Sequence, residues 1–248
     1  MLGFWLPVAA LWKRELVRFW RQKSRVLGVV ASPLVFWLLI GSGFGDLAYY
    51  FPGALVLTVM FSAIFSTMSI IEDRREGFLL SMLVSPASRG SMVLGKVLGA
   101  ATLAWIQGLI FLAFAPLAGL RTPLAGLAAV AGSIFLISFT LTALGFMIAW
   151  KMNSTQGFHA IMNLFLVPMW MVSGAVFPIA GAQGWMRAVM WANPLTYSLA
   201  LLRELLAPAS AAGGPGIVAS LWVTVGFGIV LLAAASMLAS RKSPESSA

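Results

Sequence analysis

The sequence predicts an all-α polytopic membrane protein with six transmembrane helices and an N-terminal amphipathic helix at the membrane interface. The chain of 248 residues is 60% hydrophobic and 9% charged, so it carries more apolar surface than a soluble domain of this length buries. Six stretches without Asp, Glu, Lys or Arg each supply the roughly 20 residues that a helix needs to cross the hydrocarbon core. Because these runs lack the alternation of barrel strands, helices are the expected spanning form.

Residues 1–25 are predicted to form an amphipathic helix in the membrane interface. Apolar residues recur there at helical spacing, and most basic residues fall elsewhere around the helix. This pattern suits a helix whose aromatic rings lie at headgroup depth. The alternative is an ordinary anchor ahead of the first span. The apolar residues are Leu11, Trp12, Leu16, Phe19 and Trp20, and the basic ones are Lys13, Arg14, Arg18 and Arg21.

The six spans are expected to form one transmembrane domain, residues 26–240, without a soluble domain. Their predicted ranges are 26–44, 50–71, 93–120, 124–150, 158–178 and 217–239. Between the last two, residues 179–206 are predicted to be a partly re-entrant pair of short helices on the outer side. Asn193 and Pro194 are expected to break this pair, since proline removes a backbone donor. Residues 241–248 form a short tail.

The distribution of basic residues predicts the orientation. Of the 16 Lys and Arg residues, only Arg121, Arg187 and Arg203 fall on one side of an even-numbered bundle. The positive-inside rule therefore predicts that both termini are cytoplasmic. The net charge of +9 favours contact with anionic lipid headgroups over nucleic acid, because the basic residues lie between apolar runs.

The composition offers little material for catalysis or metal binding. The chain has no Cys and a single His, His159, which excludes thiolate and histidine-cluster metal sites. Residues 90–97 resemble a phosphate-binding P-loop, but Val97 stands where the Mg²⁺-ligating hydroxyl belongs and no strand precedes the loop. We therefore expect no catalytic residue, no metal ligand and no cofactor bound by this chain.

Four residues are candidates for translocation or gating: Asn163, Pro168, Asn193 and Pro194. Asn163 either lines an interior path or bonds between helices, and Pro168 is expected to kink the fifth span. In the same span, His159 is either a proton-relay residue or an ordinary hydrogen-bonded histidine. The lack of an acidic partner in that span favours the second interpretation.

The densest group of charges lies in residues 72–92, which we expect to be a cytoplasmic loop. Both charge signs occur there, although only positive charge sets orientation. A short apolar stripe follows and ends near a proline. A helix of this kind suits docking into the groove of a partner, and a loop without a partner is the alternative. The candidate docking residues are Glu72, Asp73, Arg74, Arg75, Glu76, Gly77, Leu80, Leu83, Pro86 and Arg89.

This loop resembles the first cytoplasmic loop of ABC-2 type permeases, the membrane subunits of bacterial ATP-binding-cassette exporters. The whole layout is similar too, with an interfacial helix, six spans and an Asn-Pro segment before the last span. A common family form has Thr and an acidic residue where this chain has Phe78 and Leu80. The resemblance is carried by the acidic pair, Arg75, Glu76, Gly77, the Leu-rich stripe, Pro86, Arg89, Gly95 and Lys96.

The resemblance implies an ABC-2 type exporter fold and a function. Residues 72–92 would hold a coupling helix that receives the stroke of a separate ATPase subunit, which binds ATP and Mg²⁺. Two copies of the chain would form a homodimer in the bacterial plasma (inner) membrane and move a hydrophobic, lipid-linked or polysaccharide-type substrate outward. Two other classes stay open: a membrane-embedded lipid-modifying enzyme, and a proton-coupled secondary transporter. The first needs convergent catalytic groups and the second intramembrane carboxylates.

Overall fold

The computed structural model describes residues 2–20 and 23–240, and every regular element within these ranges is helical. The all-α fold class predicted from the sequence is thus confirmed. The predicted tail, 241–248, lies outside the described residues. The helices are α1 (Leu2–Trp20), α2 (Lys23–Phe44), α3 (Leu47–Thr67), α4 (Ser69–Arg75), α5 (Phe78–Val84), α6 (Arg89–Leu112), α7 (Leu124–Trp150), α8 (Thr155–Trp170), α9 (Gly184–Ala192), α10 (Pro194–Leu206) and α11 (Ile217–Ser240).

Within the described part of the chain, five helical stretches are long and apolar enough to cross a membrane. A sixth, shorter apolar helix, Gly28–Phe44, coincides with the first predicted span. The chain therefore has the polytopic membrane architecture that its composition predicts. The five stretches are Leu47–Arg75, Arg89–Leu112, Leu124–Trp150, Thr155–Ala175 and Ile217–Ser240.

The third span differs from its predicted range of 93–120 at both ends. Helix α6 begins earlier, at Arg89, because the hydroxyl of Ser88 accepts a hydrogen bond from the backbone N–H of Ser91 and caps the first turn. It ends earlier too, at Leu112. A short 3₁₀ helix, Ala115–Ala118, follows, since a proline interrupts the α-helical hydrogen bonds and Gly119 turns the chain with a φ of 74°.

The fifth span breaks at a glycine. After α8, residues Met171–Ala175 form a single π-helical turn, in which Gly174 has a φ of 97°. Only glycine adopts this backbone without strain. Pro168 lies inside α8, before the break.

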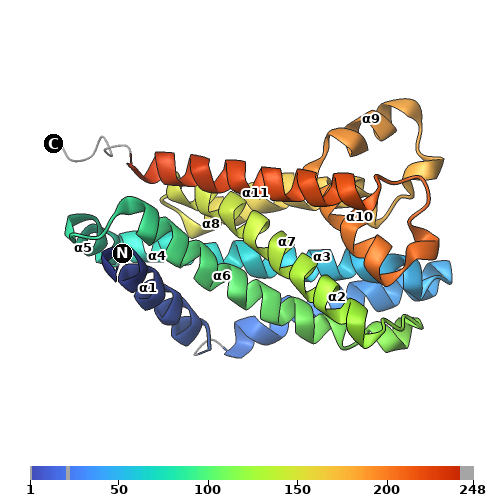
Figure 1. Cartoon of the computed structure of the whole chain (residues 1–248), viewed down its shortest axis with the longest axis horizontal. Helices are drawn as coiled ribbons and strands as arrows, with labels where there is room; N and C mark the ends of the chain where they lie inside the picture. Colours follow the sequence, from blue (N-terminus) through green and yellow to red (C-terminus); the bar gives the residue numbers. More distant parts are fainter. Residues whose placement is uncertain (1, 21–22, 241–248) are drawn as a thin grey trace.

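The helices pack around α3, which contacts α2, α6 and α7 and lies behind α6 and α7 in the view of Figure 1. The most apolar window of Leu47–Arg75 is 89% buried, against 22% for Ile217–Ser240 on the outside of the bundle. Because a surface helix in a membrane faces lipid tails, the exposed apolar side chains of α11 need no protein partner.

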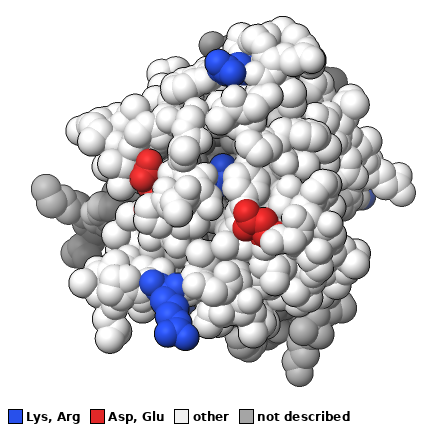
Figure 2. All heavy atoms as spheres, turned by 90° about the vertical axis from the view of Figure 1, so that its right-hand side faces the viewer, with Lys and Arg blue, Asp and Glu red and all other residues white. Residues whose placement is uncertain are grey.

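The two ends of the bundle carry different elements. Helices α4 and α5 lie at one end, together with the start of α1, and α9 and α10 lie at the other (Figure 1). These ends are termed the α5 end and the α9 end below. Seen from the α9 end, the surface is largely uncharged (Figure 2). The charged clusters of the chain therefore gather at the α5 end.

Candidate coupling site at the α5 end

The predicted loop 72–92 is mostly helical. Helix α4 continues the line of α3 through Arg75, so the first charged residues of the predicted loop lie on a helix. Glu72 falls in the first turn of α4 and Arg74 and Arg75 in its last, which matches the helix dipole at both ends. The chain then turns at Gly77 into α5 and returns to the bundle in α6.

Gly77 makes the corner between α4 and α5 possible. Its φ is 74°, in the left-handed region, and a Cβ built on it would find no atom within 4 Å. Position 77 therefore favours glycine because of its backbone conformation, and a side chain there would meet no steric clash.

We expect Gly77→Ala to destabilise the corner by about 1–2 kcal/mol, the usual cost of a left-handed backbone for a residue with a Cβ. Gly77→Asn should cost less, because asparagine tolerates this region better. Thermal unfolding of the purified variants measures the difference. Equal melting temperatures for the alanine variant and the wild type would show that the corner adopts another conformation.

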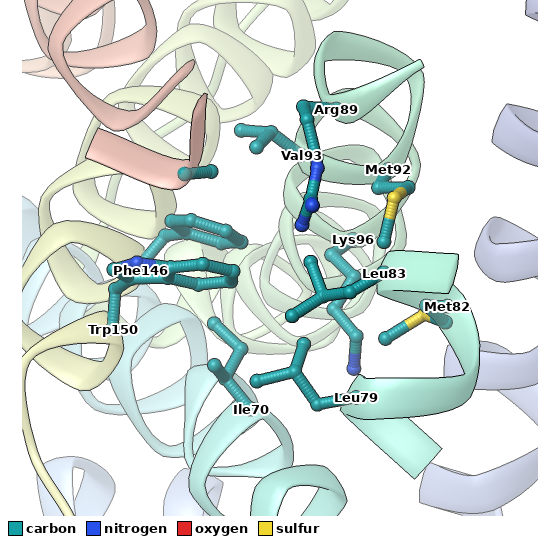
Figure 3. A pocket seen from close by; sticks show the side chains of 11 residues that line it. Ile70, Leu79, Met82, Leu83, Arg89, Met92, Val93, Lys96, Phe146 and Trp150 are labelled. Carbon is teal, nitrogen blue, oxygen red and sulfur yellow. The ribbon is translucent and has the colours of Figure 1, made fainter. Parts of the chain in front are cut away.

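Helix α5 is seated in the bundle by its apolar side. Leu79 and Met82 are buried, and Leu83 is half-buried. Together they line an apolar cavity of about 10 Å³ with residues from α4, α6, α7 and α11 (Figure 3). Phe146 and Trp150 of α7 stack on each other in its wall, with ring centroids 5.5 Å apart. Helix α5 therefore contacts several spans at once.

The opposite side of α5 faces away from the bundle. Leu80 is 66% exposed and Val84 85% exposed. The adjoining Arg75, Glu76 and Pro86 are exposed as well, although Arg75 donates to the Asn153 backbone oxygen at 3.3 Å and Glu76 lies 3.5 Å from Arg18. We term Arg75, Glu76, Leu80, Val84 and Pro86 the docking face. Of the residues predicted to dock, Leu83 points partly inward, so the apolar part of the face consists of Leu80 and Val84.

Two further arginines of the predicted site bind the bundle. The guanidinium of Arg74 donates to the backbone oxygen of Met152 at 2.9 Å and to the side-chain oxygen of Asn153 at 2.7 Å, beyond the end of α7. Arg89, in the first turn of α6, is half-buried and lines the cavity beside α5 (Figure 3). Both side chains therefore hold the corner of α4 and α5 against the bundle, and neither belongs to the docking face.

Asp73 is the centre of an ion cluster that joins α4 to α1 and α6. Its side chain is fully buried. It accepts two hydrogen bonds from Arg14, at 2.7 and 3.1 Å, one from Arg18 at 2.9 Å, and a short one from Lys96. Lys96 also pairs with Glu15 of α1 at 2.7 Å. This group of residues, with Glu72 bound to Arg18 at 2.6 Å, is termed the ion cluster.

The charges of the ion cluster are balanced. Within the cluster, three cations, Arg14, Arg18 and Lys96, meet three carboxylates, Glu15, Glu72 and Asp73, and the exposed Glu76 lies at its rim, 3.5 Å from Arg18. Burial opposes the charge of Arg14, but its hydrogen bond to Asp73 and the nearby negative charges outweigh this and raise its pKa above the ordinary value. Buried ions need such pairing, because an unpaired charge in a low-dielectric interior is costly.

Helix α1 approaches α6 closely at two glycines spaced four residues apart. A Cβ on Gly95 would lie 3.0 Å from the Leu11 Cβ, and one on Gly99 would lie 2.8 Å from the Glu15 Cβ. This small-residue spacing lets two helix backbones meet. It also explains the P-loop-like residues 90–97: Gly95 and Lys96 hold α1 against α6.

The ion cluster was not predicted from the sequence. The amphipathic pattern of α1 gave no role to Glu15, and Lys96 figured only in the P-loop-like motif and in the family resemblance. A signal was present, since Glu15 is the only acidic residue among the basic residues of the N-terminal segment. Trp12, expected at headgroup depth, donates its indole N–H to the hydroxyl of Thr102 in α6 at 3.1 Å.

The translocation candidates lie apart from this end. Asn163 and Pro168 are exposed on α8. Asn193 is buried; its side-chain nitrogen donates to the Met169 carbonyl at 2.6 Å, and its side-chain oxygen caps α10, whose first residue is Pro194. The structure therefore gives Asn193 a role in joining α10 to α8. His159 is half-buried, with its ring 5.0 Å from that of Phe65.

A helical bundle with several membrane-crossing helices and a charged helical corner at one end is the architecture of a polytopic membrane protein. Residues 7–207 match the ABC-2 type transporter family, and the chain belongs to this family. The corner of α4 and α5 is the segment in which its resemblance to these permeases was seen.

Three relatives illustrate the match. The transport permease ycf38 of Cyanophora paradoxa is 25% identical over 80% of this chain and 73% of its own length. Nodulation protein J of Rhizobium leguminosarum bv. viciae is 26% identical over 79% of this chain and 81% of its own. The linearmycin resistance permease protein LnrN of Bacillus subtilis is 29% identical over 67% of this chain but 43% of its own length. The chain thus spans less than half of the last relative.

Proposed function

We propose that this chain is the permease subunit of an ATP-driven exporter and that the docking face receives the ATPase subunit. The exposure of Leu80 and Val84 on a helix whose other side is anchored in the bundle carries this proposal. Outside the hydrocarbon core, adjacent exposed apolar side chains with charged flanks are typical of an interaction site. Membership of the ABC-2 family implies an ATPase partner, in which ATP and Mg²⁺ would bind.

The contacts of α4 and α5 suggest how a stroke of the ATPase reaches the membrane. Movement of α5 presses on α6 and α7 through packed side chains, because Leu79 and Met82 belong to one apolar cluster with Met92 and Trp150. Asp73 and Lys96 tie the same corner to α1, so the elements at this end move together. A rigid corner transmits force better than a loop, because packed interiors have low compressibility.

The proposal also includes the orientation of the chain in the membrane and its assembly into a dimer. The α5 end lies in the cytoplasm, both termini with it, because the basic residues concentrate there. A second copy of the chain covers the exposed side of α8, since Asn163 would otherwise place a polar amide in lipid. The setting is the bacterial inner membrane, and the exported molecule is hydrophobic, lipid-linked or of the polysaccharide type. A relative named as a linearmycin resistance permease supports an export function.

The test is copurification of the ATPase subunit and transport after a change in the docking face. Leu80→Asp places a charge in an apolar contact and should reduce partner capture at least about tenfold, while the permease inserts normally. Glu76→Lys should weaken capture less, because its charge stays at the rim. The matched control is Val189→Asp, also at an exposed apolar position but at the α9 end.

Normal ATPase capture and transport by Leu80→Asp would refute the docking proposal. Loss of capture with Val189→Asp as well would show a general defect and place the interface elsewhere.

A further inference from the structure

An isolated buried arginine lies at the α9 end. Arg203 of α10 is 6% exposed. One of its terminal nitrogens donates to the carbonyl oxygen of Gly174 at 2.9 Å, and its guanidinium carbon lies 4.4 Å from the centre of the Tyr49 ring. The guanidinium thus sits where α8 breaks and where α3 begins.

Arg203 uses few of its donors. A guanidinium has five N–H groups in a planar fork. Arg203 donates to the carbonyl oxygen of Gly174 and interacts with the Tyr49 hydroxyl, and its Nε is buried without a partner among the described residues. No Asp or Glu in that part of the chain lies within ion-pair distance, and the exposed Asp46 acts on it only through charge. Arg14 and Arg18, by contrast, each hold carboxylates.

A cation in this state favours an anionic ligand. Contact with an aromatic face and a carbonyl offsets part of the desolvation cost of a buried guanidinium. The buried Nε–H still lacks the acceptor that a buried donor normally has. Charge-assisted bonds from a guanidinium fork to an oxyanion are the strongest way to supply it.

A cavity of about 20 Å³ adjoins Arg203, between the start of α3, the break after α8, and α10. This is room for about one oxygen-sized atom. The hydroxyls of Tyr49, Ser173 and Thr196 line it but already donate to backbone carbonyls. Arg203 and Ser210 are therefore the side-chain donors that remain for a ligand. Figure 2, which faces this end, shows basic atoms at the bottom of a recess near the middle of the surface.

We infer that the cavity beside Arg203 binds one oxygen of an oxyanion, of the phosphate class, whose remainder lies outside the cavity. An anionic phospholipid headgroup and free phosphate share this chemistry. Arg203 provides the charge and the planar donors, and Ser210 adds a hydroxyl at the rim. Because the same guanidinium holds the carbonyl of Gly174, occupancy of the site is coupled to the break after α8.

Two ligand arms separate the sources of the oxyanion. In the first, the purified protein in neutral detergent is titrated with inorganic phosphate, and thermal unfolding is followed. In the second, the protein is placed in nanodiscs of phosphatidylcholine with or without phosphatidylglycerol, and native mass spectrometry counts retained lipid. Stabilisation by phosphate alone identifies a free anion, and selective retention of phosphatidylglycerol identifies a headgroup.

The variants are Arg203→Gln, Arg203→Lys and Ser210→Ala, with Arg187→Gln as the matched control. Arg187 is an exposed arginine of the same end that bonds only to backbone carbonyls. Arg203→Gln should abolish the ligand effect, and Arg203→Lys should weaken apparent affinity about tenfold, because an ammonium lacks the fork. Arg187→Gln should behave as wild type.

The lysine and Ser210 variants keep the test decisive if Arg203→Gln fails to fold. The inference is wrong if wild type responds in neither arm. It is also wrong if the response survives equally in the Arg203 variants, or if Arg187→Gln loses it to the same extent.

Discussion

Replacing Asp73 by Asn is expected to lower the free energy of unfolding by roughly 3–5 kcal/mol, the cost of breaking a buried ion pair on one side. The carboxylate is fully buried and is shared by Arg14, Arg18 and Lys96. Asparagine keeps the size but leaves three cations facing two carboxylates. Its amide N–H₂ also points a donor at other donors, which adds the cost of an unmet hydrogen bond.

The measurement is thermal or denaturant unfolding of the purified permease. The matched control is Glu76→Gln, since Glu76 lies at the rim of the cluster with its side chain 60% exposed. It should change stability by about 0.5 kcal/mol or less. The double variant Asp73→Asn with Lys96→Met should lose less than the sum of the single variants, because it removes a cation together with its partner. Wild-type stability of Asp73→Asn would show that the cluster is open to water.

Replacing Gly99 by Leu is expected to push α1 away from α6. The first added carbon would lie 2.8 Å from the Glu15 Cβ and 3.4 Å from the Trp12 Cα, so the helix itself has to shift. Overpacking of this kind costs about 1–3 kcal/mol. The loss should be larger here, because displacing Glu15 also takes a carboxylate from Lys96.

Separation of the two helices can be followed apart from global unfolding. The chain has no Cys, so Leu11→Cys provides a single thiol at a position that is 7% exposed. This thiol should resist a maleimide reagent in the wild-type background and react readily when combined with Gly99→Leu. Gly90→Ala is the control on the same helix, since its new Cβ would meet one atom at 3.9 Å. Equal protection of the thiol in both backgrounds would contradict the proposed α1–α6 contact.

Local pattern predicted the helical membrane fold but not every helix boundary. The continuous apolar runs required lipid as their surroundings, and the structure confirms the class. The errors fell at capping residues and glycines, such as Ser88 before α6 and Gly174 after α8. These helix ends depend on a few side-chain and backbone hydrogen bonds, and a hydropathy pattern carries no information about them.

The candidate site was predicted only in part. The clustered charges and Leu-rich stripe pointed to residues 72–92, but the pattern did not distinguish exposed from anchoring positions. The structure exposes Leu80 and half-buries Leu83, and it buries Asp73 while leaving Glu76 at the surface. The rotation of the seven-residue α5 about its axis is set by the side chains against which it packs, so periodicity alone leaves it undetermined.

The sequence by itself determined that this chain is a helical bundle in a membrane. No other arrangement accommodates so much apolar surface while pairing the backbone N–H and C=O groups in hydrogen bonds. The sequence also determined which segment carries the charges that lie outside the hydrocarbon. The tertiary structure alone decided that Glu15 meets Lys96, 81 residues away, and that Arg203 meets no carboxylate among residues 2–20 and 23–240. The reason is physical: contacts between helices depend on how close their backbones approach and in what register, and two glycines of α6 set both for α1.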